Sequence, residues 1–203
     1  MRAPLALALA AALHSPPEAR AADAPAGATT LYVRPGDSDV TFRIRKWGVL
    51  TVTGRFADVS GEVFLDPGRP NRSHVRVEVR VASVSTGEEV RDRMLQSEDF
   101  FDAGRFPSMT FVSTAASRLA DGRVSVTGEL TIRGVTRRVT VPVTVHGPSV
   151  DPEAGGLAGF EATFRLDRRD YGVLGSRWSG GRTVLGNDVE VRLVLAASVR
   201  RSR

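Results

Sequence analysis

Residue types that carry out catalysis are sparse in this chain, and Asp92 and Asp99 form the best-spaced pair. Two carboxylates can serve as general acid and general base when both reach the same substrate. Their surroundings favour a structural role, because Asp92 follows Arg91, with which it would hold a short helix in place, and Asp99 precedes the turn at Phe100. A hydrolase or isomerase using these aspartates is the weaker alternative, and we predict no enzyme activity and no catalytic residues.

The sequence gives even less support for a metal site, a catalytic nucleophile or a phosphate-binding loop. Beyond the N-terminal segment the histidines are His74 and His146, about 70 residues apart, and the chain has no cysteine. Zinc sites need three or four ligands of these types close together. Ser176 and Ser179 stand near glycines but do not form a G-x-S-x-G elbow, and the glycines of 172–186 precede a strand pattern instead of a helix. We therefore predict no metal and no cofactor.

The charge pattern argues against a nucleic-acid partner. The formal net charge is +5, but acidic and basic residues alternate along the chain and gather only in the short tail Arg200-Arg201-Arg203. A nucleic-acid surface would combine a basic face with interleaved aromatic side chains. We expect no nucleic acid to bind.

Residues 1–21 are predicted to be a cleaved signal peptide. Arg2 gives a positive start, residues 4–13 form an apolar run, and Ala19-Arg20-Ala21 supplies a small-x-small cleavage pattern. The run is shorter than the roughly 20 residues that span a bilayer. We expect one exported domain over 22–203 without a transmembrane segment, located in the periplasm or otherwise secreted. The absence of cysteine, and hence of disulfides, fits the periplasm better than a small secreted scaffold.

Alternation of apolar and polar residues dominates the remaining chain and predicts an all-β fold. Apolar side chains occupy every second position over 75–81, 139–145, 160–166 and 189–195. Such alternation is typical of antiparallel strands with one wet and one dry face. We count eight to ten strands with short connections, which favours a meander that closes into a barrel.

Turn and breaker residues predict where these strands end. Asp121-Gly122 predicts a tight hairpin, because both residues tolerate positive φ, and Arg133-Gly134 predicts another tight reversal. Residues 57–61 are predicted as a turn between two strands. Pro142 lacks a backbone N–H, so we expect its strand to be interrupted there or to lie on an edge.

One helix interrupts the strands. Thr86 is predicted as its N-cap, with Glu89 completing a capping box. Val90, Met94 and Leu95 give the helix an apolar side. We expect this helix to cover one end of a barrel whose interior holds an apolar molecule.

Several segments, in a fixed order over about 30–198, carry a family resemblance: 39–42, 52–56, 60–61, 83–87, 91–95, 99–102, 106–111, 126–136 and 170–173. Together they resemble the YceI-like family of exported lipid- or polyisoprenoid-binding proteins. The resemblance implies a lipocalin-like, extended antiparallel barrel of about eight strands, with one helix and an apolar tunnel for an isoprenoid chain. The ligand it implies is a long-chain polyisoprenoid or similar amphiphile, such as an isoprenoid quinone, carried or stored in the cell envelope.

Candidate ligand-binding residues follow from the inward strand positions, which are mostly valine with few bulky aromatics, so that the barrel keeps empty volume. The predicted tunnel residues are Phe42, Ile44, Phe56, Val77, Val79, Phe111, Val141, Val143, Phe164 and Val191. The predicted rim residues are Lys46, Trp47, Arg91, Asp92, Arg177 and Trp178.

Head-group recognition is assigned to the rim, because the inner faces are aliphatic. Lys46 and Arg177 would contact a phosphate or quinone oxygen, and Trp47 would cover the first isoprene unit. The simpler alternative places Trp47 in the core and both cations in solvent. A structural or partner-binding envelope protein without ligand remains the second function class, and a homodimer remains open.

Overall fold

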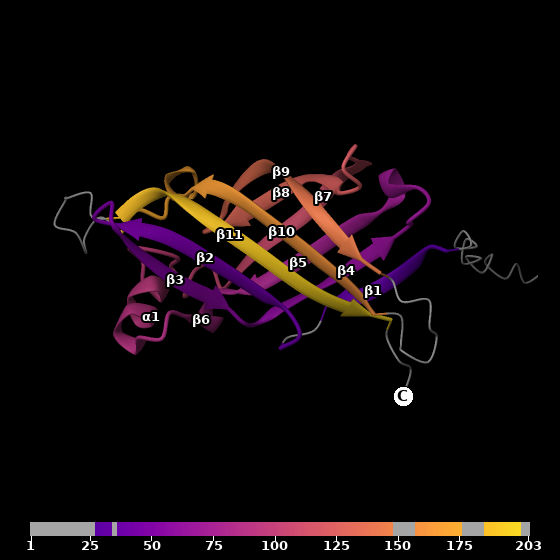
Figure 1. Ribbon diagram of the computed structural model, residues 1–203. Coiled ribbons are helices and arrows are strands. Elements are labelled where there is room, and N and C mark those ends of the chain that lie inside the picture. Colours follow the sequence, from indigo (N-terminus) through magenta and orange to yellow (C-terminus); the bar gives the residue numbers. More distant parts are fainter. Residues whose placement is uncertain (1–26, 34–35, 148–156, 176–184, 200–203) are drawn as a thin grey trace, which may run out of the picture.

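The structure is a computed structural model that describes residues 27–33, 36–147, 157–175 and 185–199 (Figure 1). The described residues contain one α-helix, α1 (Glu89–Gln96), and three short 3-10 helices, η1 (Pro70–Arg72), η2 (Val81–Ser83) and η3 (Arg168–Tyr171). The strands are β1 (Thr29–Val33), β2 (Asp39–Lys46), β3 (Leu50–Phe56), β4 (Val59–Leu65), β5 (His74–Arg80), β6 (Val84–Ser85), β7 (Ser108–Arg118), β8 (Val124–Ile132), β9 (Val135–His146), β10 (Ala158–Asp167) and β11 (Leu185–Ser198).

The strands close into an antiparallel barrel. One edge of β11 pairs with β10, and its other edge pairs first with β2 and then with β1. β1 and β2 therefore run in the same direction and act as one interrupted strand, as do β3 with β4 and β5 with β6. Counted this way the ring has eight long strands, which confirms the predicted fold class.

The barrel is elongated and has two distinct ends (Figure 1). The helix end carries α1, the β2–β3 turn, the β8–β9 turn and η3. The hairpin end carries the β4–β5 connection with η1 and the β7–β8 hairpin. Both predicted reversals are confirmed: Gly122 has φ 84°, and Arg133 and Gly134 have φ 50° and 73°, as a tight hairpin turn requires.

Residues 57–61 do not form the predicted turn. β3 and β4 run in the same direction with only two residues between them. Asp58 fixes this break, since its carbonyl accepts from the Arg80 amide at 3.0 Å and its carboxylate from Arg80 Nε at 3.1 Å. Gly61 lies within β4, where a Cβ atom would stand 2.3 Å from the Arg76 carbonyl oxygen. The glycine thus permits close strand approach and is not a turn residue.

The predicted capping box is also wrong. α1 begins at Glu89 after Glu88, whose side chain makes no capping hydrogen bond. Thr86 lies outside the helix because Gly87, with φ 80°, redirects the chain between them. Instead, Asp92 Oδ1 accepts from the Thr86 backbone N–H at 2.8 Å and from its hydroxyl. The helix thus holds the preceding loop through its own carboxylate.

Pairing between β9 and β10 is incomplete. The two strands pair only over Val143–His146 and Gly159–Ala162, although β9 pairs with β8 over Val135–Val143. Pro142, which has no N–H to donate, stands where the β10 pairing stops. β9 is therefore an edge on this side, as predicted, while the strand itself is not interrupted. We call the unpaired stretch, residues 135–142 facing 163–167, the seam.

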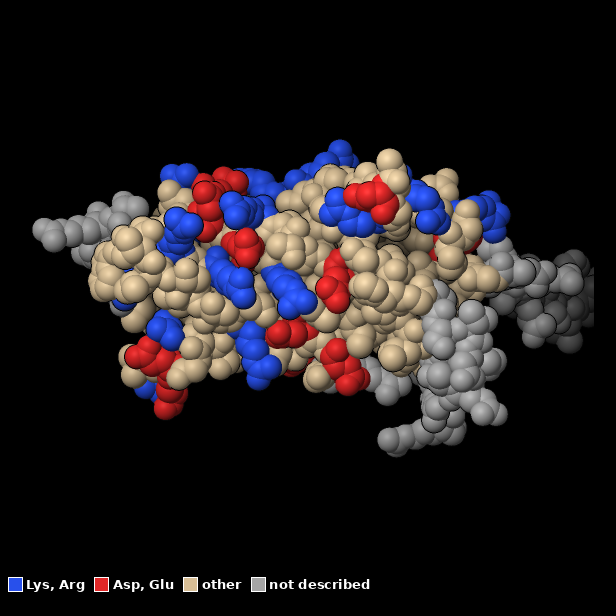
Figure 2. Space-filling model, viewed as in Figure 1, with Lys and Arg blue, Asp and Glu red and all other residues tan. Residues whose placement is uncertain are grey.

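The outer surface of the barrel mixes charges of both signs (Figure 2). On neighbouring strands, the Glu190 carboxylate lies 3.8 Å from the Arg43 guanidinium and 3.4 Å from that of Arg165. The Glu161 carboxylate lies 3.6 Å from the Arg192 guanidinium. Exposed pairs of this kind contribute at most about 1 kcal/mol each. Their regular spacing follows from the polar half of the alternating strand pattern.

Candidate functional site: an apolar tunnel

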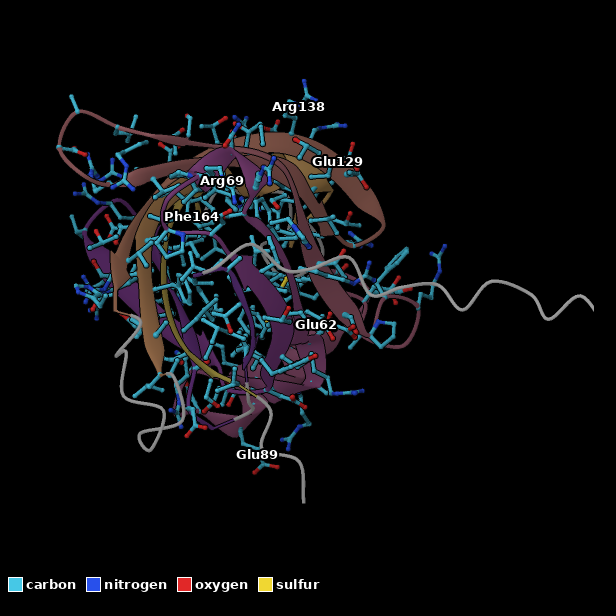
Figure 3. All side chains as sticks on the ribbon, turned by 90° about the vertical axis from the view of Figure 1, so that its right-hand side faces the viewer. Glu62, Arg69, Glu89, Glu129, Arg138 and Phe164 are labelled. Carbon is cyan, nitrogen blue, oxygen red and sulfur yellow. The ribbon has the colours of Figure 1, made fainter. Side chains whose placement is uncertain are left out.

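The interior of the barrel holds a cavity of about 610 Å³. Its wall reaches the helix end at Lys46 and Met94 and the hairpin end at Leu65 and Gly147, so the cavity is a tunnel along the barrel. Figure 3 looks into the barrel from the hairpin end, with Phe164 on the inner side. The volume lies within the roughly 300–1,000 Å³ of small-molecule sites.

Period-2 alternation positions this wall, because successive side chains of a strand point to opposite faces. Each long strand contributes its apolar series to the tunnel and its charged series to the surface. All ten predicted tunnel residues lie in the wall: Phe42, Ile44, Phe56, Val77, Val79, Phe111, Val141, Val143, Phe164 and Val191. Their contact with a ligand stays a prediction.

The wall is more aromatic than the sequence suggested. Aromatic side chains in it are Phe42, Phe56, Phe100, Phe101, Phe111, Phe160, Phe164 and Tyr171. The tunnel stays open partly because two rings lie against glycines. A Cβ atom at Gly54 would stand 2.3 Å from the Phe42 ring, and one at Gly128 would stand 2.5 Å from the Phe111 ring. In the sequence, these two contacts could have been predicted only from a glycine that stands within a strand pattern.

The rim residues at the helix end divide into two groups. Lys46 and Arg91 lie in the tunnel wall, whereas Trp47 and Asp92 do not. Arg91 pairs with Glu88 at 2.7 Å and donates through Nε to the Thr86 hydroxyl at 2.8 Å. Its guanidinium is thus held by the loop that enters α1.

Trp47 is not the core residue that the simpler alternative assumed. It is 60% exposed and has φ 52° in the β2–β3 turn. Lys46 Nζ lies 4.3 Å from the centroid of its ring, a cation–π contact. The other predicted rim pair, Arg177 and Trp178, lies outside the described residues.

Arg168 is a wall residue that sequence reasoning missed. Its guanidinium donates to the carbonyl oxygens of Gly186, Val173 and Leu174 at 2.8, 2.7 and 2.6 Å. Burial lowers the pKa of Arg168 from its usual value, yet an arginine keeps its charge in proteins. The neighbouring carboxylate, Asp167, forms its ion pair with Arg169 instead of Arg168. Arg168 therefore joins the segment after η3 to the start of β11. No sequence motif predicts this role.

Polar wall residues at the hairpin end close the β4–β5 connection. Asp66, which is buried, accepts from the Arg69 backbone N–H at 3.0 Å and from its Nε at 3.1 Å. Ser73 Oγ accepts from the Asp66 amide at 2.9 Å, and Arg118 donates to the Pro67 carbonyl at 2.9 Å. These side chains form their hydrogen bonds with one another and with the backbone of the connection.

The catalytic and metal candidates do not assemble in the part of the chain that is described. No group of three or more His, Cys, Asp or Glu side chains there is arranged to hold a metal ion. Asp92 and Asp99 are both absent from the tunnel wall. The His74 ring stacks on Phe64 with 4.9 Å between centroids. No described helix has the length and apolar character needed to cross a bilayer.

A closed antiparallel barrel around an end-to-end apolar tunnel defines a lipocalin-like class of fold. Within that class the chain belongs to the YceI-like domain family, whose sequence model matches residues 32–197. The resemblance seen in the sequence is thereby confirmed.

Curated relatives of the chain are UPF0312 proteins of pseudomonads. The protein of Pseudomonas syringae pv. syringae is 36% identical over 173 residues, covering 84% of this chain and 86% of its own. That of Pseudomonas fluorescens is 40% identical over 140 residues, covering 66% and 71%.

Solved structures share the barrel. Burkholderia cenocepacia BcnA matches with a TM-score of 0.73 and 27% identity, covering 82% of this chain and 99% of that one. A polyisoprenoid binding domain from Saccharophagus degradans matches with a TM-score of 0.67 over 84% and 98%. At 16% identity the second match shows the fold alone.

Proposed function

We propose that this protein is a non-catalytic binding protein that holds a long-chain polyisoprenoid or similar amphiphilic lipid in its tunnel. The observation that carries the proposal is the tunnel itself, an apolar space of about 610 Å³ that reaches both ends of the barrel. An elongated site of this shape accepts a chain better than a compact molecule.

Burial of hydrocarbon accounts for affinity without a polar motif. Each buried CH₂ group contributes about 0.8 kcal/mol, so each five-carbon isoprene unit contributes roughly 3–4 kcal/mol. Association costs on the order of 4–15 kcal/mol in lost freedom. A chain of several units therefore binds through the wall alone. The description of the Saccharophagus degradans domain as polyisoprenoid-binding agrees with this ligand class.

The proposal includes a location and a role. The predicted signal peptide, residues 1–21, lies outside the described residues, and with the cysteine-free composition it supports export to the periplasm. Carriage or storage of an envelope lipid, such as an isoprenoid quinone, is the corresponding role. The head group would lie at the helix end, where Lys46 and Arg91 line the tunnel.

The direct test is to identify what the protein carries. Protein purified from cell envelopes is examined by native mass spectrometry and by organic extraction, and we expect an apolar chain in the tunnel. Ala162→Phe places a ring into the tunnel wall and should abolish binding, whereas Thr163→Phe, on the exposed outer face of the same strand, should not.

Failure to bind any isoprenoid alcohol or quinone, in both the wild type and Thr163→Phe, would contradict the proposal. That result would favour the structural or partner-binding alternative.

A further inference from the structure

The β2–β3 turn exposes a cluster of large apolar side chains. Val49 is 82% exposed and Leu50 52%, and they follow the exposed Trp47. We call these three residues the apolar tip. Single exposed apolar residues are ordinary on protein surfaces, but adjacent ones mark interaction sites.

Backbone geometry fixes the tip beyond the end of the barrel. Lys46 pairs with Leu50 across the hairpin, and the Val49 amide donates to the Lys46 carbonyl at 3.3 Å. Trp47 and Gly48 both have positive φ, 52° and 73°. The turn is therefore a tight one that presents its side chains outward and cannot fold them into the core.

The tip stands at the tunnel mouth. Lys46, the residue before it, lines the tunnel together with Val90, another exposed apolar residue of α1. Lys46 also pairs with Leu185. Arg168 binds the carbonyls of both Leu185 and the exposed Leu174. Figure 1 shows the β2–β3 turn and α1 at the same end of the barrel.

The charges behind the tip are cationic. Residues 44–50 contain Arg45 and Lys46 and no carboxylate, whereas Arg43 pairs with Glu190 on the neighbouring strand. The glutamates at the start of α1 are already neutralised, since Glu88 pairs with Arg91 and Glu89 with Arg93. An apolar tip with an aromatic ring and flanking cations is complementary to the interface of an anionic bilayer.

We propose that the helix end docks on an anionic lipid bilayer, with the apolar tip inserted among the lipid head groups. Docking in this orientation places the tunnel mouth against the membrane, so that an apolar chain moves between bilayer and tunnel without crossing water. The transfer step rests on the proposed function, but docking itself does not and is measured separately.

The test uses Trp47 as its own reporter. The chain has two tryptophans, so Trp178→Phe leaves Trp47 alone. Mixing this protein with phosphatidylcholine–phosphatidylglycerol vesicles should shift the Trp47 emission to the blue and expose it to brominated-lipid quenchers. Binding should weaken on vesicles of phosphatidylcholine alone and at high salt, because the attraction to anionic lipid is screened.

Serine substitutions separate the tip from other apolar surface. In the same background, Val49→Ser with Leu50→Ser should lower vesicle partitioning by on the order of tenfold or more. Leu157→Ser and Val112→Ser are the controls, since those side chains are also exposed, at 53% and 37%, but lie away from the tip. Their partitioning should match that of the parent.

Three results would overturn the docking proposal. One is Trp47 emission that does not change with vesicles, and another is a tip variant that partitions like Leu157→Ser. The third is a blue-shifted Trp47 without vesicles together with a dimer mass in light scattering, which would mean that a second copy covers the tip. Ligand delivered from cyclodextrin should bind the tip variant as it binds the parent. If the parent takes up no ligand from cyclodextrin, the proposed function fails and the vesicle result still stands.

Discussion

Two glycine–phenylalanine contacts set the bore of the tunnel at the level of single residues. The Phe42 ring lies over Gly54 of the paired strand, and the Phe111 ring lies over Gly128. Packing in protein interiors is dense, so a ring that loses its place on one wall must take space elsewhere. Here the available space is the tunnel itself.

Adding one methyl group at these glycines should therefore narrow the site. We expect Gly54→Ala and Gly128→Ala to weaken binding of a long isoprenoid by roughly tenfold, with destabilisation of about 1–3 kcal/mol from overpacking. Gly159→Ala is the matched control, because its nearest neighbour atom would be an ordinary 3.5 Å away. Ligand titration and thermal unfolding measure both effects. Equal affinities in all three variants would contradict this account of the bore.

Arg168 provides a second prediction at this scale. Arg168→Met leaves the part-buried carbonyl oxygens of residues 173 and 186, and the more exposed one of residue 174, without their donor. Each such loss costs about 1–3 kcal/mol, so chemical denaturation should show a loss of at least that size. Arg93→Met is the control, since Arg93 is exposed, pairs with the exposed Glu89 and should change stability little. An Arg168→Met protein as stable as the parent would show that these hydrogen bonds do not stabilise the fold.

Asp167 supplies a pH prediction. The hydrogen bond from Arg169 lowers its pKa from 3.8 to about 2. Because the folded-state pKa is depressed, this pairing stabilises the fold above the unfolded pKa and is lost as the pH falls toward the folded one. An NMR titration should find the Asp167 pKa near its usual value in Arg169→Met. An unchanged low pKa would assign the shift to another cause.

At the scale of secondary structure, the sequence pattern correctly predicted the features that depend on neighbouring residues alone. Alternation located the inward faces of β2, β5, β9, β10 and β11, because burial of one face dictates the residue types on it. The break at Ala57-Asp58 was mistaken for a reversal, since chain direction there depends on pairing with β1, which is remote in sequence. The cap at Thr86 failed because Gly87 changes the path of the backbone. The alternative that placed Trp47 in the core was wrong, since the exposure of this side chain follows from the geometry of the turn.

The molecule as a whole stabilises its barrel without disulfides and around an apolar tunnel. A ligand that binds only the folded state adds stability by mass action, about 2.7 kcal/mol at a concentration of 100 times Kd. For a domain of this size, each kcal/mol shifts Tm by roughly 2–4 °C. Delipidated protein should therefore melt about 5–10 °C below the loaded form in calorimetry, and Ala162→Phe should show no such difference between preparations.

The seam between β9 and β10 creates an aggregation hazard. Unpaired strand edges are templates on which another chain can add a strand, the first step toward intermolecular sheets. This chain has charged residues along both edges, Arg137 and Arg138 on β9 and Arg165 on β10, and Pro142 removes one donor. These are the devices that protect exposed edges in natural sheets. These residues along the seam thus protect a barrel with an incompletely paired wall from polymerising with its own copies.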